Sequence, residues 1–187
     1  MVIPDQLIDR TKNRTGTFFG DGIVAHVTFA DPFCLSLSDV VYNVARDVGT
    51  TVHKGGTYVV MEGPLFSTKA ESNLYRSWGA SVIGMTALPE AKLAREAEMC
   101  YATIAFATDY DCWHDAHESV TVEMIISNLL RNVRTAKELV KRIVALIPEE
   151  RDCACASALE NAIVTAPDRI PPHLRQRLSL LIGKYMR

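Results

Sequence analysis

Short β-branched segments alternate with amphipathic segments along the first part of this sequence, and this alternation most constrains its fold. Strands are expected at 2–9, 23–30, 57–63, 81–85 and 100–108, and helices at 38–49, 68–79 and 89–99. The helix at 38–49 has Ser38 as a candidate N-cap and Gly49 as a stop, and Thr68 and Glu71 form a capping-box pattern. Strands that alternate with helices predict an α/β layer fold.

A long amphipathic segment follows from Val122. Its apolar residues recur at helical spacing, which predicts one long helix or two in series, ended by Pro148. We expect most of this apolar face to lie in the core and its first turn to face a ligand. A charged break then leads to a tail with two further helical segments, the second preceded by Pro171 and Pro172.

Composition narrows the possible partners. The 187 residues carry a net charge of −2 and 48% of them are hydrophobic, so no strong field favours nucleic acid or an anionic membrane. The first ten residues lack a signal-peptide pattern, and no apolar run has membrane-spanning length. The five cysteines, an odd number without a secretion signal, fit a reducing compartment. We therefore expect a cytoplasmic chain that binds neither nucleic acid nor a membrane.

Two carboxylates follow the expected buried strand at 100–108, in the stretch "ATDYDCW". Asp109 and Asp111 stand at i and i+2, a spacing that points both side chains to one side of an extended segment. A metal site, an acid/base pair and a device that recognises a polar ligand edge all fit this spacing. Ligands of α/β sheets gather at strand ends, and the segments "MEGPLFS" and "GMT" also end strands here.

Five ordered blocks of the sequence resemble the trimeric purine nucleoside phosphorylases, and among them the branch that cleaves 5′-methylthioadenosine. The blocks are 4–11, 26–33, 61–72, 84–102 and 107–113. The resemblance implies the three-layer α/β fold of nucleoside phosphorylases, with a mixed central sheet flanked by helices. It also implies a single domain over 1–187, in which 1–147 match the family core and 148–187 form a helical tail.

The resemblance implies phosphorolysis, in which phosphate attacks the anomeric carbon of the ribose and adenine leaves. Phosphate is then a co-substrate, and no cofactor is needed. By resemblance Asp109, in its protonated form, addresses the imidazole-ring nitrogen of the base and neutralises the charge that grows on it. Asp111 accepts from the exocyclic amino group, which favours a 6-amino purine over a 6-oxo purine because a carboxylate only accepts.

The other matched positions imply the rest of the pocket. The base would be contacted by Phe66, which stacks on it, and by Ser67 and Thr108. The ribose would lie over Met85, and Thr86 would bond phosphate and sugar hydroxyls. An apolar pocket for the 5′-methylthio group would be lined by Val122, Ile125 and Ile126. His26 would reach the neighbouring subunit's site, so the resemblance implies a homotrimer.

One departure from the family pattern concerns phosphate. The family's Gly-rich segment, its Arg-His pair and a further threonine are absent from this sequence, and Thr86 alone matches a phosphate ligand. We therefore expect the chain to correspond to the C-terminal two-thirds of a phosphorylase, without the N-terminal part of the family fold. A phosphorylase of broader purine nucleoside specificity and a non-catalytic nucleoside-binding or assembly subunit remain alternatives.

No metal site is expected. His114 and His117 lack a third ligand at convincing spacing, so a solvated loop is the simpler interpretation. Cys153 and Cys155 form a Cys-x-Cys pair, for which we expect free thiols because so short a disulfide is strained.

Overall fold

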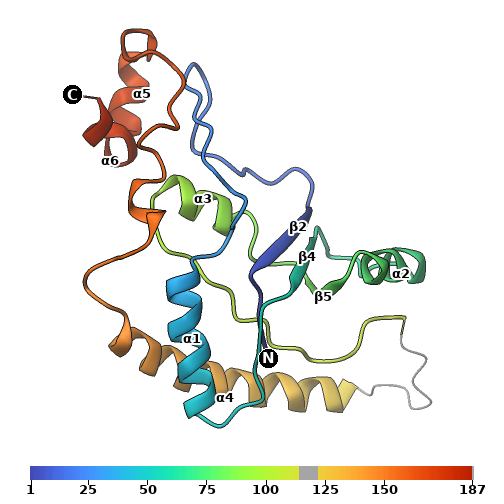
Figure 1. Cartoon of the computed structure of the whole chain (residues 1–187). Coiled ribbons are helices and arrows are strands. Elements are labelled where there is room, and N and C mark those ends of the chain that lie inside the picture. The colour runs from blue at the N-terminus through green and yellow to red at the C-terminus, as the bar shows by residue number, and fades with distance from the viewer. Residues whose placement is uncertain (114–121, 187) are drawn as a thin grey trace.

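The computed structural model describes residues 1–113 and 122–186 (Figure 1). The body of the chain runs β1 (Val2–Ile3), β2 (Gln6–Arg10), α1 (Leu35–Asp47), β3 (His53–Lys54), β4 (Thr57–Met61), α2 (Lys69–Ser77), β5 (Ala80–Gly84), α3 (Glu90–Glu96) and α4 (Val122–Leu146). The tail holds η1 (Ala154–Ser157), η2 (Pro167–Arg169), α5 (Pro172–Arg177), α6 (Ser179–Ile182) and η3 (Gly183–Tyr185). None of the helices within residues 1–113 and 122–186 combines the length and the hydropathy of a membrane-spanning segment.

A parallel sheet with the order β2-β4-β5 lies in the body, and β1 pairs with β3 in a second parallel ladder. The α/β class with helices beside the sheet is therefore confirmed. The ladders of the named strands are parallel, and the antiparallel pairing that the structure describes consists of isolated bridges, Val2 with Ala105 and Ala25 with Ile163. Because the three strands of the sheet are parallel, Arg10, Met61 and Gly84 end at the same edge.

The buried side chains form three clusters. Under the sheet, Tyr58 and Val60 of β4 pack with Phe33, Leu88 and Ala91. A second cluster joins Ile3 to α1 and α4, and a third joins residues 19–27 to the tail. In Figure 1, α1 stands on α4 at one end of the molecule, while the tail helices α5 and α6 lie at the other.

Local sequence signals explain α2 fully and α1 only in part. The predicted capping box is present, since Thr68 accepts from the Glu71 backbone and the Glu71 carboxylate accepts from the Thr68 backbone. The predicted N-cap of α1 was wrong: the cap is Cys34, and the Ser38 backbone N–H donates to the Cys34 carbonyl at 2.9 Å. Ser38 therefore lies one turn inside the helix, where its buried hydroxyl has no hydrogen-bond partner.

The strands predicted at 23–30 and 100–108 were also wrong. Each segment forms one isolated bridge, at Ala25 and at Ala105, and neither contains a named strand. Ala105 exchanges both backbone hydrogen bonds with Val2, at 2.8 Å each. An apolar run becomes a strand only where a neighbour continues the ladder, and here the ladder ends after one pair.

The expectation that the apolar face of α4 lies mainly in the core was wrong as well. Leu139 and Ile143 are buried against α1 and β1. The exposed large apolar residues that the structure describes on the same helix are Ile126, Leu129, Leu130, Val133, Val140, Val144 and Leu146. Helical periodicity predicted the helix correctly, but it could not show how much of the apolar face is covered.

Candidate functional site

The carboxyl edge of the parallel sheet brings together the segments that follow β4 and β5. Phe66 and Ser67 follow β4, and Met85 and Thr86 follow β5. Gly63 has a φ of +72°, and a Cβ on it would lie 2.5 Å from the Met85 sulfur. Glycine is therefore needed where the two segments cross, because any side chain would displace Met85.

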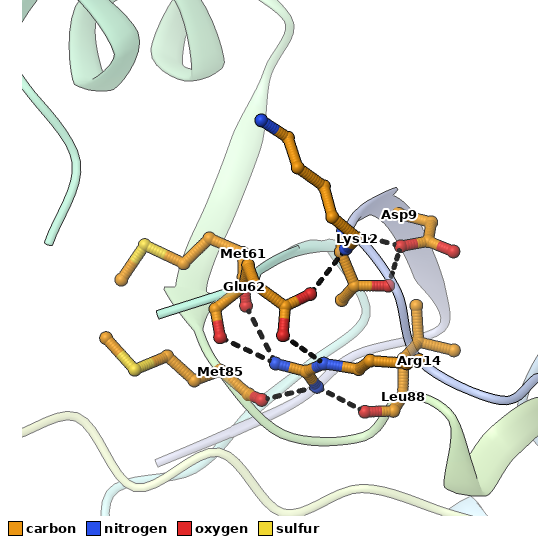
Figure 2. Close-up of polar contacts among 8 residues, drawn as sticks. Asp9, Lys12, Arg14, Met61, Glu62, Met85 and Leu88 are labelled. Atoms are coloured by element: carbon orange, nitrogen blue, oxygen red, sulfur yellow. Dashed lines mark hydrogen bonds and ion pairs between the residues drawn. The ribbon is translucent and has the colours of Figure 1, made fainter. Parts of the chain in front are cut away.

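The guanidinium group of Arg14 forms hydrogen bonds with both segments and links them (Figure 2). Arg14 donates to the carbonyls of Met61 (3.3 Å) and Glu62 (2.8 Å) at the end of β4, and to those of Met85 (2.9 Å) and Leu88 (2.5 Å) after β5. Its Nε donates to a Glu62 carboxylate oxygen at 3.0 Å. A guanidinium has five N–H groups, so this arrangement engages all of them. Arg14 thus fixes the separation of the two segments.

Acidic side chains next to Arg14 complete this support. The Glu62 carboxylate also accepts from the Lys12 backbone N–H, and the hydrogen bonds from Lys12 and Arg14 lower the pKa of Glu62. Asp9 pairs with Lys92 at 2.5 Å. Burial opposes ionisation of Asp9, but the bonds from Lys92 and Thr11 outweigh it and lower its pKa.

Thr86 is positioned by a buried tyrosine of β4. The Tyr58 hydroxyl lies 3.2 Å from Thr86 Oγ1 and accepts from the Thr86 backbone N–H at 3.3 Å. Gly84 allows this approach, because a Cβ there would lie 2.4 Å from the Tyr58 hydroxyl. Thr86 itself is exposed, so its hydroxyl is held by the protein on one side and open to solvent on the other.

The two predicted carboxylates lie in a loop rather than at a strand end, and they have different partners. Asp111 accepts from the Ser72 hydroxyl of α2 and from the Cys112 backbone N–H (2.9 Å). Asp109 is exposed and accepts from the Thr108 hydroxyl at 2.7 Å. The loop contacts the β4 segment, since the Cys112 thiol lies 3.5 Å from the Ser67 carbonyl. Asp111 is thus fixed to α2, while Asp109 stays accessible.

The start of α4 borders the same loop. Asn128 donates to the Thr108 carbonyl at 3.1 Å, and Asn132 donates to the Ala107 carbonyl at 3.3 Å. Ile126 is half exposed, and Phe66 is 83% exposed. The side chains of Val122 and Ile125, like His114 and His117, lie outside the described residues.

His26 is placed apart from the other predicted residues. Its backbone N–H donates to the Ala162 carbonyl of the tail at 2.8 Å, and its side chain is exposed. The segment around it runs beside the tail in Figure 1, away from the carboxyl ends of β4 and β5. Within one chain, His26 therefore does not join the sheet-edge residues.

Sequence reasoning missed three residues that hold this site: Arg14, Tyr58 and Ser72. Arg14 stands in a polar loop with no periodicity, Tyr58 had the pattern of an ordinary strand residue, and Ser72 that of an ordinary helix residue. The one local signal in the sequence is the glycine in "MEGPLFS": Gly63 takes a positive φ in the structure, where the two segments approach closely.

The carboxyl edge of the parallel sheet carries an exposed aromatic ring and hydroxyls, and the adjacent loop carries two carboxylates. This is the arrangement of an α/β protein that binds a polar ligand at its strand ends. A model of the phosphorylase superfamily matches residues 1–145, and the chain belongs to this superfamily.

Two bacterial relatives are similar over nearly the whole chain. The S-methyl-5′-thioadenosine phosphorylase of Geobacter sulfurreducens is 58% identical over 187 residues, which are 100% of this chain and 65% of the relative. The enzyme of the same name from Koribacter versatilis is 58% identical, over 98% of this chain and 63% of its own length. The chain therefore spans less than two thirds of these relatives.

Solved structures agree with the fold. A methylthioadenosine phosphorylase from an antarctic soil metagenomic library superposes with a TM-score of 0.90 at 46% identity, over 96% of this chain and 64% of that one. A methylthioadenosine phosphorylase from Schistosoma mansoni, in complex with adenine, gives a TM-score of 0.79 at 30% identity, over 87% of this chain and 66% of that one.

Proposed function

We propose that this chain carries the adenine and methylthioribose side of an S-methyl-5′-thioadenosine phosphorylase. The reaction is phosphorolysis of 5′-methylthioadenosine to adenine and 5-methylthioribose 1-phosphate, in purine and methionine salvage. The observation that carries the proposal is the 58% identity to two relatives of that name over essentially the whole chain. We further propose that the chain acts in the cytoplasm.

The geometry supports specific roles at the sheet edge. Phe66 offers an exposed ring for stacking on the base, which is worth roughly 1–3 kcal/mol per base. Asp111, which is fixed by Ser72, would accept a hydrogen bond from the exocyclic amino group of the base. Asp109 is accessible and, in its protonated form, would donate to the imidazole-ring nitrogen of a bound base. Thr86, held by Tyr58, would bond the sugar and phosphate oxygens.

The remaining pocket positions follow the same proposal. Met85 would lie under the ribose, and Ser67 and Thr108 would border the base. The 5′-methylthio group would meet Val122, Ile125 and Ile126 at the start of α4. His26 is exposed and apart from its own sheet edge, which fits a role in the site of a neighbouring copy within a homotrimer.

Binding experiments with the chain test this proposal. Adenine titrated into the 187-residue protein should bind measurably by calorimetry, and hypoxanthine should bind more weakly, because its 6-oxygen would face the Asp111 acceptor. Asp111→Asn should reduce this preference, since an amide can also donate. Absence of adenine binding in a folded protein, or an unchanged preference in Asp111→Asn, would overturn the assignment.

Phosphate dependence is a separate measurement. Thr86 alone offers one hydroxyl to a dianion that needs several converging donors. We therefore expect no phosphate-dependent release of adenine from 5′-methylthioadenosine by this chain on its own. Robust release would show that the chain builds a phosphate site from residues not assigned here.

A further inference from the structure

Four of the five cysteines converge at one point, although they come from three distant parts of the sequence. Cys34 caps α1, Cys100 follows α3, and Cys153 and Cys155 lie at the start of η1. The four Sγ atoms all lie within 4.8 Å of one another, and those of Cys100 and Cys153 are 3.4 Å apart. The fifth cysteine, Cys112, is exposed and is not a member of this cysteine cluster.

Hydrogen bonds that each involve a backbone group hold together the three segments that carry the clustered cysteines. The Cys34 backbone N–H donates to the Tyr101 carbonyl at 2.8 Å, which fixes the start of α1 beside Cys100. On the tail side, Arg151 donates to the Glu98 carbonyl at 2.7 Å, and the Leu159 backbone N–H donates to the Glu98 carboxylate at 3.0 Å. The sulfur atoms therefore meet because the fold brings their backbones together.

The surroundings of the sulfur atoms suit coordination better than a solvent-exposed reaction. Cys34 and Cys155 are only 4% and 6% exposed, and Cys100 and Cys153 are half-buried. The Cys155 backbone N–H also bonds the Cys153 sulfur. The four sulfur atoms thus face one another in a largely buried position, where one metal ion could contact all of them.

The spacing matches a tetrahedral thiolate site. Zn²⁺ binds cysteine sulfur at about 2.3 Å, so the sulfur atoms of a regular tetrahedron stand about 3.8 Å apart, within the observed limit. A disulfide would need an S–S distance of about 2.05 Å, shorter than the 3.4 Å between the sulfur atoms of Cys100 and Cys153. Four sulfur ligands also close the coordination shell, as in structural rather than catalytic zinc sites.

We propose that Cys34, Cys100, Cys153 and Cys155 bind one zinc ion that fastens the C-terminal tail to the body of the chain. The ion replaces the thiol protons, which pass to solvent, and no electron transfer is involved. Because the ligands come from α1, the segment after α3 and the tail, the binding free energy of the ion stabilises the docked tail. This inference does not depend on the proposed phosphorylase activity.

The decisive measurements use the unmodified 187-residue protein, purified under reducing conditions. Elemental analysis after dialysis should find about one zinc ion per chain, and X-ray absorption should show a shell of four sulfur atoms at about 2.3 Å. Cys153→Ser should bind zinc at least about tenfold more weakly, whereas the matched control Cys112→Ser, outside the cysteine cluster, should keep its zinc. Circular dichroism of both variants checks that they are folded.

Three results would overturn the proposal. One is a zinc-free protein that takes up no zinc when zinc chloride is added. Another is a mass lower by two or four hydrogen atoms in protein purified without reductant, which would show one or two disulfides. The third is a zinc shell that contains nitrogen or that depends on Cys112. All three can be read from the unmodified protein and the Cys112→Ser control, so a Cys153→Ser variant that fails to fold leaves the test intact.

Discussion

The carboxyl edge of the sheet and the junction between the tail and the body are held by opposite means. At the edge, the Arg14 guanidinium binds backbone carbonyls from behind, while Phe66 and Asp109 remain exposed. At the junction, the Glu98 carboxylate pairs with Lys184 of the tail, and the sulfur atoms of the cysteine cluster lie close to one another. A surface that receives a ligand must leave its side chains free, so its support comes through the backbone. At a structural junction the side chains themselves can form the stabilising contacts, because no ligand has to reach them.

The largest expected effect tests whether catalysis takes place at the exposed carboxyl edge of the sheet. In a chimaera that joins this chain to the part of the Geobacter sulfurreducens relative that it does not match, Asp109→Asn should lower kcat by roughly 10²–10⁴-fold, because an amide cannot supply the proton. Steady-state kinetics with 5′-methylthioadenosine and phosphate measure this. A variant that keeps its turnover would make Asp109 an ordinary loop residue.

Removal of the support behind the edge should have the next largest effect. Arg14→Ala leaves the carbonyls of Met61, Glu62, Met85 and Leu88 without their donor, so the free energy of unfolding should fall by about 3 kcal/mol or more. Arg14→Lys should recover only part of it, because an ammonium has three donors and no planar fork. Urea unfolding measures both variants.

Arg175→Ala is the control for Arg14, because Arg175 is an exposed arginine of α5. Its unfolding free energy should stay within about 0.5 kcal/mol of the parent. If Arg14→Ala also left the free energy of unfolding unchanged, the carboxyl edge would not depend on the Arg14 guanidinium. The edge and the junction would then not differ in how they are held.

The junction should be the acid-sensitive region. Burial alone would raise the pKa of Glu98, but bonds from Lys184 (2.5 Å), Tyr185 and the Leu159 backbone lower it below the ordinary value of 4.5. A carboxylate with a depressed pKa stabilises the fold above its unfolded pKa and loses that contribution as the pH falls through its folded pKa. Glu98→Gln should therefore cost about 2 kcal/mol at pH 7 and progressively less below about pH 4.5.

Urea unfolding of the parent and of Glu98→Gln between pH 7 and pH 3 measures this difference. Glu160→Gln is the control, since Glu160 is an exposed glutamate of the same tail. A difference between parent and Glu98→Gln that stays constant across this range would show that the Glu98 charge does not anchor the tail.

The smallest expected effect concerns the hydrogen bond between Tyr58 and Thr86 at the carboxyl edge. Tyr58→Phe removes the hydroxyl that bonds Thr86 while keeping the buried ring, so it should cost about 1 kcal/mol of unfolding free energy. In the chimaera, the KM for phosphate should rise more than the KM for the nucleoside if Thr86 bonds phosphate. Equal changes in both constants would show that Tyr58 only packs the core.

Local signals in the sequence predicted the elements that depend on neighbouring residues. The capping box at Thr68 and Glu71, the helical spacing of α4 and the β-branched strand β4 are all present, and their alternation gave the α/β class. The segment 100–108 failed because a strand requires a partner, and its apolar run alone could not show that only Ala105 would pair.

What the sequence determined by itself was therefore the set of helices, most of the sheet and the segments that meet at its carboxyl edge. Tertiary structure alone decided that Arg14 would bind carbonyls more than forty residues away and that three distant segments would bring four sulfur atoms within 4.8 Å. Periodicity and caps act over a few residues, so they leave a pattern in the sequence. Contacts between distant residues arise only when the packed elements bring them together, and no local pattern records them.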